Sequence, residues 1–165
     1  MKVILFGASG LVGKSVLRQC LLDPDVKAVL SVGRRPSAIS HPKLRDIVCA
    51  DMFAFNVNAD EWNGYVACFF CLGVSSVGMS EAEYTRLTYN LTMGWAHALA
   101  RLNPALKFLY VSGMGAGGKA QFQIADTRAT ARLAAPGVED MRACILAMSA
   151  RRSSLTRTRP IDGLM

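Results

Sequence analysis

The sequence predicts an α/β fold in which about five short strands form a parallel sheet. Two observations lead to this prediction. Up to about residue 113, short apolar runs alternate with stretches whose apolar residues recur at helical spacing. In addition, a glycine-rich segment at residues 7–13 directly follows the first apolar run. Strands that alternate with helices in this way are typical of a parallel sheet with right-handed crossover connections.

The expected strands are the five apolar runs Val3–Phe6, Ala28–Val32, Asp46–Cys49, Val66–Leu72 and Lys107–Val111. A first helix follows the glycine-rich segment, and the helical spacing assigns Leu11 and Val12 to its buried face. A long helix is expected from Ser80 to Leu102. Ser80 has the position of its N-cap, and Glu83 is the partner that completes a capping box.

The alternating pattern is lost after Gly113. The rest of the chain is rich in Ala, Arg, Thr and Ser, and only Val138–Met148 has the pattern of a helix. We therefore expect residues 1–116 to form the folded domain. Residues 117–165 are expected to be a pattern-poor, irregular segment that is partly disordered.

The composition argues against several classes of protein. No segment approaches the ~18 consecutive apolar residues that a membrane span needs, and the first apolar run is too short for a secretory signal. We therefore expect a cytoplasmic protein without a membrane partner. The net charge is +7, but the basic excess per residue is largest after residue 117, with no aromatic residue interleaved beyond Phe122. A nucleic-acid partner is therefore not expected.

Five cysteines lie inside apolar segments, which indicates reduced thiols in the core. Cys68 and Cys71 have the C-x-x-C spacing of a redox or zinc site. On a strand, however, residues three apart point to opposite faces, and no second pair or histidine cluster follows. No metal site is predicted.

The glycine-rich segment Gly7-Ala8-Ser9-Gly10-Leu11-Val12-Gly13 lies between a strand and a helix, which is the context of a dinucleotide-binding loop. In such a loop the first glycine permits a tight turn, the second lets the backbone approach the pyrophosphate, and the third lets helix and strand pack closely. The helix N-terminus then offers free N–H donors to the phosphates. The fold class expected is therefore a Rossmann-like, doubly wound parallel sheet.

A phosphate loop of the nucleotide triphosphatase kind is an alternative for the same residues. Gly13-Lys14-Ser15 resembles the end of that motif, although the leading glycine is missing, and Asp51 ends a run that resembles its second motif. Lys14 would then hold the β- and γ-phosphates and Ser15 the magnesium ion. The dinucleotide interpretation is favoured because Leu11 and Val12 are expected to be buried in the helix.

The end of the second strand indicates which dinucleotide is bound. Sites that prefer NAD carry an acidic residue there, whereas NADP sites offer arginine to the 2′-phosphate. Here Arg34 and Arg35 follow Gly33, with no acidic residue nearby. Guanidinium groups bind a phosphate through paired hydrogen bonds, so NADP(H) is the expected cofactor and NAD(H) the less favoured one. Ser9 can add a hydroxyl contact to the same phosphate.

These features resemble the atypical short-chain dehydrogenases of the NmrA-like and Tat-interacting-protein-like kind. The resemblance covers residues 1–116. It includes the glycine loop, Gly-Arg-Arg after the second strand, Asp51 after the third, Cys-Leu-Gly at 71–73 and the segment Tyr-Val-Ser-Gly-Met-Gly-Ala at 110–116. It implies a reductase- or epimerase-like ancestry.

The resemblance also implies roles for particular residues. Asp51 and Met52 would flank the adenine, Leu72 and Gly73 would lie at the nicotinamide-side ribose, and Ser112 would be the catalytic residue beside the reactive carbon. The residues expected to bind the cofactor are Gly7, Ala8, Ser9, Gly10, Leu11, Val12, Gly13, Arg34, Arg35, Asp51, Met52, Leu72 and Gly73.

The sequence departs from this group after the fifth strand. The group carries a tyrosine, with a lysine four residues later, about a dozen residues beyond that strand, and the pair moves the proton that accompanies hydride transfer. Here no tyrosine follows Tyr110 and no lysine follows Lys119. The sequence thus supports two hypotheses: an NADP(H)-binding relative of reductases and epimerases acting on a small molecule, or a non-catalytic NADP(H) sensor with a protein partner.

Overall fold

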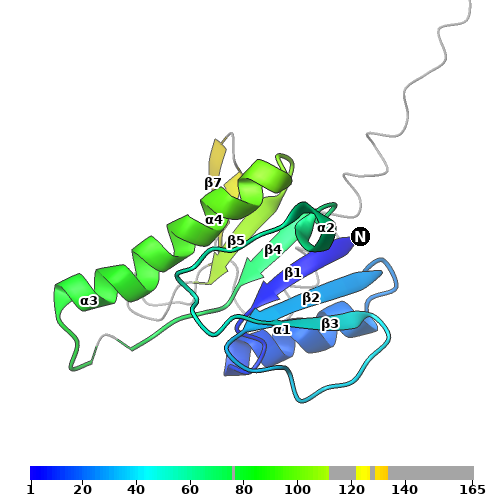
Figure 1. Cartoon of the computed structure of the whole chain (residues 1–165), viewed down its shortest axis with the longest axis horizontal. Coiled ribbons are helices and arrows are strands. Elements are labelled where there is room, and N and C mark those ends of the chain that lie inside the picture. The colour runs from blue at the N-terminus through cyan, green and yellow to red at the C-terminus, as the bar shows by residue number, and fades with distance from the viewer. Residues whose placement is uncertain (76, 112–121, 127–128, 134–165) are drawn as a thin grey trace, which may run out of the picture.

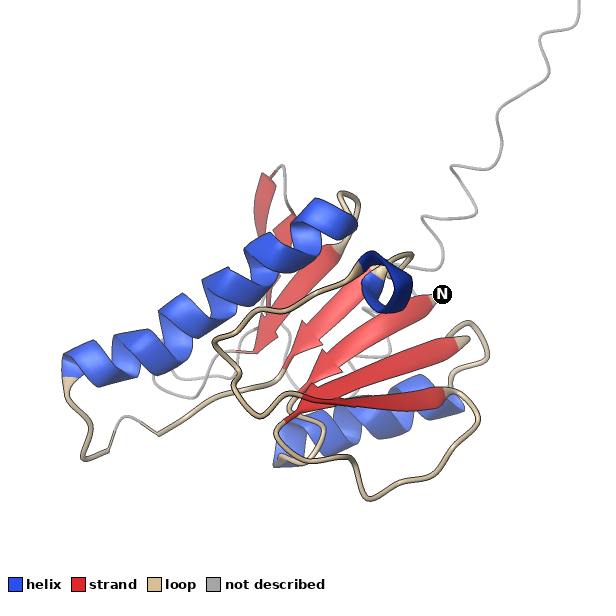
Figure 2. Cartoon of the chain, in the orientation of Figure 1, coloured by secondary structure: helices blue, strands red, loops and turns tan. Residues whose placement is uncertain are grey.

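The computed structural model describes residues 1–75 and 77–111, and the backbone of two further strands at 122–126 and 129–133. Seven strands form one sheet (Figures 1 and 2): β1 Lys2–Phe6, β2 Ala28–Gly33, β3 Leu44–Val48, β4 Ala67–Phe70, β5 Lys107–Val111, β6 Phe122–Asp126 and β7 Ala129–Leu133. Their order across the sheet is β3-β2-β1-β4-β5-β6-β7. The first five strands pair in parallel, and β6 and β7 continue the sheet in antiparallel fashion.

The first five strands confirm the expected Rossmann-like α/β fold. β1 lies between β2 and β4, and the order β3-β2-β1-β4-β5 is that of a dinucleotide-binding sheet. Val3–Phe6 of β1 and all of β4 are buried, since these central strands are covered by helices on both faces. β3 begins two residues earlier than expected, and β4 is shorter than the apolar run that predicted it.

The two faces of the sheet have separate apolar cores. One core packs against α1 (Leu11–Leu22) through Val16, Leu17 and Cys20. The other lies beneath α2 (Ala59–Trp62) and α4 (Leu91–Leu102), where Trp62 stacks on Trp95 with ring centroids 5.5 Å apart. Figure 1 shows these helices on either side of the strands.

The long helix expected at residues 80–102 is present. It consists of α3 (Glu81–Thr85), a π-helical turn η1 (Arg86–Asn90) and α4, which follow one another without a break. Its N-cap is Ser80, whose hydroxyl accepts a hydrogen bond from the Glu83 amide at 3.2 Å. α3 and η1 bury no residue, so this half of the helix extends beyond the sheet (Figure 1).

The expectation that Leu11 and Val12 are buried is wrong. Leu11 is 87% exposed and Val12 39% exposed. Leu11 lies on the outward face of α1, on the same stripe as exposed Lys14 and Arg18. Both apolar residues belong to the first helical turn, where α1 leaves the glycine loop. Because both residues are exposed, burial of Leu11 and Val12 gives no reason to prefer a dinucleotide-binding loop over a triphosphatase loop.

Beyond β5 the structure adds two strands to the five that the sequence predicts. β6 and β7 form an antiparallel pair. They occupy the part of the sequence in which the resemblance to short-chain dehydrogenases would place the tyrosine and the lysine. The expected helix at 138–148 lies outside the described residues. Among the helices of the described part, none is long and apolar enough to cross a membrane.

Candidate functional site

The glycine loop lies at the carboxyl edge of the sheet, beside the end of β4. Gly7 has a φ of +80°, a conformation that glycine adopts without strain. A Cβ atom at this position would lie 2.8 Å from the Cys71 carbonyl oxygen and 3.2 Å from the Leu72 side chain. The fold therefore brings Leu72 against the loop, and only glycine fits between them.

Gly13 fills a different role in the same loop. A Cβ atom on Gly13 would lie 1.9 Å from the Gly7 carbonyl oxygen, so the first turn of α1 packs directly on the loop backbone. This is the close approach that the third glycine of a dinucleotide-binding loop provides. Gly10 is unlike the other two, because a Cβ atom there would meet nothing closer than 3.4 Å.

The N-terminus of α1 is free to accept an anion. Its N-cap, Gly10, has no side chain to cap the helix, and the first turn contains no acidic residue. Gly10 donates its N–H to the Gly7 carbonyl at 3.0 Å, and Lys14 donates its N–H to the Gly10 carbonyl at 2.9 Å. The amides of the intervening first turn remain available as donors, which suits a bound pyrophosphate.

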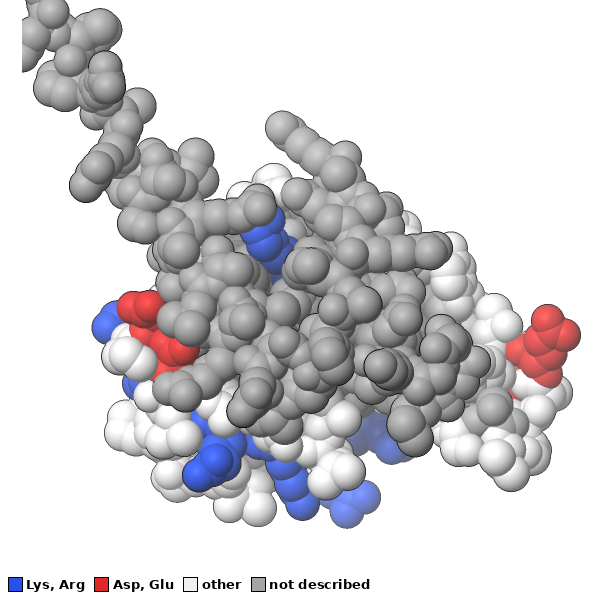
Figure 3. Space-filling view, turned by 180° about the vertical axis from the view of Figure 1, so that it is seen from behind, with Lys and Arg blue, Asp and Glu red and all other residues white. Residues whose placement is uncertain are grey.

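Arg34 and Arg35 follow β2 at the same edge of the sheet, and both are exposed. The strand end that carries them is fixed, since the Gly33 carbonyl accepts a hydrogen bond from the Cys49 amide at 2.9 Å. Seen from behind, Lys and Arg side chains gather along one border of the described surface (Figure 3). The side chains of Arg34 and Arg35 are therefore open to solvent where β2 ends.

Asp51 and Met52 begin the connection between β3 and α2. The Asp51 carboxylate is exposed and accepts a hydrogen bond from the Phe53 amide at 2.8 Å, so it caps its own turn. Asp51 also lines a cleft of about 400 Å³ beside β3. Met52 is buried, and its carbonyl accepts a hydrogen bond from the Trp95 indole at 2.8 Å.

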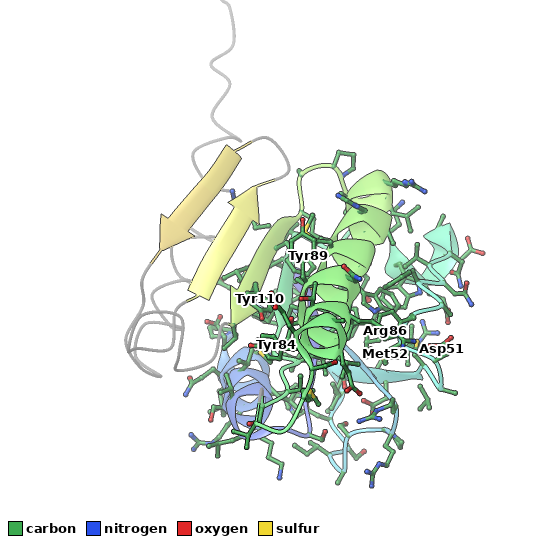
Figure 4. All side chains as sticks on the ribbon, turned by 90° about the vertical axis from the view of Figure 1, so that its left-hand side faces the viewer. Asp51, Met52, Tyr84, Arg86, Tyr89 and Tyr110 are labelled. Carbon is green, nitrogen blue, oxygen red and sulfur yellow. The ribbon has the colours of Figure 1, made fainter. Side chains whose placement is uncertain are left out.

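The same connection is locked to the long helix by aromatic contacts. Phe55 has a φ of +46°. Its ring packs against Gly94, where a Cβ atom would lie only 2.2 Å from the Cζ atom of Phe55. The Phe55 ring also meets Trp95 edge to face at 5.7 Å, and the Arg86 guanidinium lies 4.9 Å from the Phe53 ring. Figure 4 shows Arg86, Met52 and Asp51 on one side of the helix. The sequence analysis did not predict these contacts, because the local pattern contains no sign that Phe55 packs against Gly94.

Tyr84 and Tyr89 of the long helix and Tyr110 of β5 lie on the opposite side of that helix from Arg86 (Figure 4). Burial raises the pKa of the half-buried Tyr110 phenol, and the neighbouring Tyr84 phenol adds to the rise. Ser112, the expected catalytic residue, lies outside the described residues.

The four described cysteines are free thiols. Cys68 packs in the core beneath α4, and Cys71 packs against the core beneath α1, as expected for residues three apart near a strand. Burial raises the pKa of the thiols of Cys20 and Cys71 to about 12. In the described part of the chain, no three acidic, histidine or cysteine residues form a group that could hold a metal.

A larger cleft of about 490 Å³ lies elsewhere, between the outer part of α4 and residues 55–58. It contains none of the residues expected to bind a cofactor. Neither this cleft nor the one beside β3 is lined by the glycine loop, Arg34, Arg35 or Leu72.

No protein family matches the sequence, and no curated protein is similar enough to be matched. Solved structures share the fold. One is a uronate dehydrogenase from Agrobacterium tumefaciens, in a mutant form complexed with NAD, with 19% identity and a TM-score of 0.54 over 73% of this chain and 43% of that one. Another is a putative epimerase from Bacteroides thetaiotaomicron, with 21% identity and a TM-score of 0.51 over 69% of this chain and 48% of that one.

A short chain dehydrogenase family protein from Francisella tularensis subsp. tularensis SCHU S4 has 14% identity and a TM-score of 0.50, over 68% of this chain and 51% of that one. The chain thus spans about half the length, or less, of these structures. The class of protein that the fold defines is a Rossmann-like α/β protein, with the sheet that these dehydrogenases share.

Proposed function

We propose that this protein binds NADP(H) at the carboxyl edge of its sheet. The observation that carries the proposal is the glycine loop, in which Gly7 has a positive φ, Gly13 has no room for a side chain and α1 begins without a side-chain cap. The loop ends the central strand of a sheet with the dinucleotide-binding order. The neighbour described as complexed with NAD has the same fold, which supports the choice of ligand class.

Each predicted residue has a place in this proposal. The first-turn amides of α1 hold the pyrophosphate, with Ser9 beside it. Asp51 and Met52 flank the adenine, and Leu72 and Gly73 lie at the nicotinamide-side ribose. The NmrA-like resemblance supports these roles. When bound, the nicotinamide ring supplies hydride transfer.

Arg34 and Arg35 favour NADP(H) over NAD(H). They are exposed at the end of β2, where a ribose 2′-phosphate would lie, and their guanidinium groups suit a dianionic phosphate. Residues 34–43, which connect β2 to β3, contain no acidic residue, and Asp46 within β3 accepts a hydrogen bond from the Ser37 hydroxyl. No acidic residue of the strand end competes with the phosphate.

We propose that the protein binds NADP(H) but does not use a tyrosine–lysine pair to transfer a proton. No tyrosine follows Tyr110 in these 165 residues, and the antiparallel strands β6 and β7 lie where that helix would be sought. A second candidate function is therefore an NADP(H) sensor, in which the bound cofactor changes the affinity for a protein partner. The buried free thiols support our further proposal of a reducing, cytoplasmic location.

Titration of the protein with NADPH, NADH and magnesium ATP tests the proposal. NADPH should bind most tightly. Replacing both Arg34 and Arg35 by Ala should weaken the binding of NADPH but not of NADH, since each charge-assisted hydrogen bond contributes ~1.5–3 kcal/mol, or about 10- to 150-fold in affinity.

Arg101→Ala is the matched control, because Arg101 is also exposed but lies at the far end of α4. Equal affinities of the unmodified protein for NADPH and NADH would refute the role of the arginines. Tight binding of magnesium ATP in place of both dinucleotides would favour the phosphate-loop alternative.

A further inference from the structure

The connection from β2 to β3 carries both arginines and is tied to the sheet at two points. At its start, the Gly33 carbonyl accepts a hydrogen bond from the Cys49 amide at 2.9 Å. Further along, the Ser37 hydroxyl donates to Oδ2 of Asp46 at 2.8 Å. Arg34–Pro36 lies between these two anchors.

Asp46 is an unusual residue for the middle of a strand. It pairs in register with buried Ser31 of β2, on the face of the sheet to which Leu44 also points. Its Oδ1 atom is buried and has no hydrogen-bond partner among the described residues. A buried carboxylate oxygen without a partner costs stability, so a gain in stability does not explain Asp46.

The second anchor restricts the arginine turn. The Ser37 hydroxyl is 3.5 Å from the Ile39 carbonyl but 2.8 Å from Asp46, so the bond to Asp46 is the shorter of the two. Pro36 has a fixed φ and disfavours the helical conformation at Arg35. A turn that is held at both ends and stiffened by proline loses less conformational entropy when it binds a ligand.

We propose that Asp46 and Ser37 are positioning residues that hold the Arg34–Arg35 turn in place for the 2′-phosphate of NADP(H). This inference rests on the proposed function. Asp46 acts through Ser37 and does not touch the cofactor. Its carboxylate is needed as a hydrogen-bond acceptor, and an amide oxygen can serve in the same way.

The first experiment compares four variants of the full chain: Ser37→Ala, Asp46→Ala, Asp46→Asn and the control Glu61→Gln. Glu61 pairs with Arg45, a β3 residue that points to the opposite face of the sheet from Asp46. Ser37→Ala and Asp46→Ala should lower the affinity for NADPH about fivefold, equivalent to ~1 kcal/mol, and leave the affinity for NADH unchanged. Asp46→Asn and Glu61→Gln should behave like the unmodified protein.

The second experiment needs no cofactor. Trypsin cleaves after Arg34, while the bond between Arg35 and Pro36 resists it. The rate at which the Arg34–Arg35 bond is cut, relative to the bond after Arg101, reports how firmly the turn is held. We expect this relative rate to increase at least about threefold in Ser37→Ala and Asp46→Ala and to stay unchanged in Asp46→Asn, because opening of a local segment governs cleavage.

The two experiments separate this inference from the proposed function. Unchanged cleavage in both Ser37→Ala and Asp46→Ala overturns the positioning role, whichever cofactor binds. Faster cleavage with an equal loss of NADPH and NADH affinity overturns the claim of selectivity. Faster cleavage in a protein that does not prefer NADPH supports the anchor and refutes the cofactor proposal. Ser37→Ala removes only a hydroxyl from a partly exposed side chain, so it decides the matter if Asp46→Ala does not fold.

Discussion

The glycines of the loop at residues 7–13 differ in what each one allows. Gly7 has a backbone conformation that favours glycine, and Gly13 lies too close to the Gly7 carbonyl for any side chain. Gly10 has a φ of −76° and a ψ of 166°, which any residue adopts, and a Cβ atom there would meet nothing closer than 3.4 Å. The fold itself therefore does not require glycine at position 10, so its small size serves a ligand in our interpretation.

We expect Gly10→Val to weaken NADPH binding by at least about tenfold, equivalent to ~1.4 kcal/mol, because the new side chain occupies the space of the pyrophosphate. The melting temperature should change little, since valine favours extended backbone. Isothermal titration together with a thermal melt measures both quantities.

Lys14→Ala is the companion variant. Lys14 is exposed on the outer stripe of α1, so a dinucleotide loop should bind NADPH as before when this side chain is removed. Loss of nucleotide binding in Lys14→Ala would instead assign Lys14 the phosphate-holding role of the alternative loop.

Among the secondary-structure elements, the long helix and the connection after β3 form one unit. The Trp95 indole donates a hydrogen bond to the Met52 carbonyl, and the Phe55 ring occupies the space above Gly94. The φ of +46° at Phe55 is a strained conformation for an aromatic residue and persists because these contacts hold it. The backbone of Met52, which is expected to flank the adenine, is therefore fixed by the helix.

The contact between Phe55 and Gly94 should reverse the effect of one substitution. In the unmodified protein, Gly94→Ala should lower the free energy of unfolding, because the methyl group would meet the Phe55 ring and overpacking costs ~1–3 kcal/mol. In a Phe55→Ala background the same change should raise it, since alanine is favoured over glycine in a helix by ~1 kcal/mol. Denaturant unfolding of the four proteins gives the coupling. An equal effect of Gly94→Ala in both backgrounds would show that the ring does not restrict this position.

In the molecule as a whole, the two outer strands of the parallel part of the sheet, β3 and β5, have different surroundings. The outer edge strand β3 carries Arg45, which pairs with Glu61, and charge on an edge discourages further strand pairing. On the other side, β5 is not an edge, because β6 pairs with it from Val111 to Lys107. The predicted cofactor residues all lie in the part of the sheet before β6.

We expect a chain that ends at Gly117 to keep its affinity for NADPH, because all the predicted phosphate contacts precede that residue. It should associate at micromolar concentration, since removal of β6 uncovers the edge of β5. Light scattering after size exclusion, compared with the full chain at equal concentration, measures the association. A monomeric truncated chain that has lost NADPH binding would mean that residues beyond 117 contribute to the site.

Features of this protein that depend on neighbouring residues could be predicted from the amino-acid sequence. The five parallel strands, the Ser80 cap and the glycine-rich turn were predictable because hydrophobic period, capping and turn chemistry are local. The roles of Gly7 and Gly13 in the turn and in packing follow from the same spacing, whereas cofactor binding by these residues stays a prediction.

Which surfaces of the helices, strands and loops contact one another could be seen only in the folded protein. The exposure of Leu11 depends on where α1 leaves the sheet, and helical spacing alone assigned it to the wrong face. Other contacts join residues that are separated in the sequence or that belong to segments without a regular pattern. They are the packing of Phe55 on Gly94, the hydrogen bond from Ser37 to Asp46 and the pairing of β5 with β6. Such contacts leave no periodic signal, because they depend on how elements pack and on the close packing that core formation imposes.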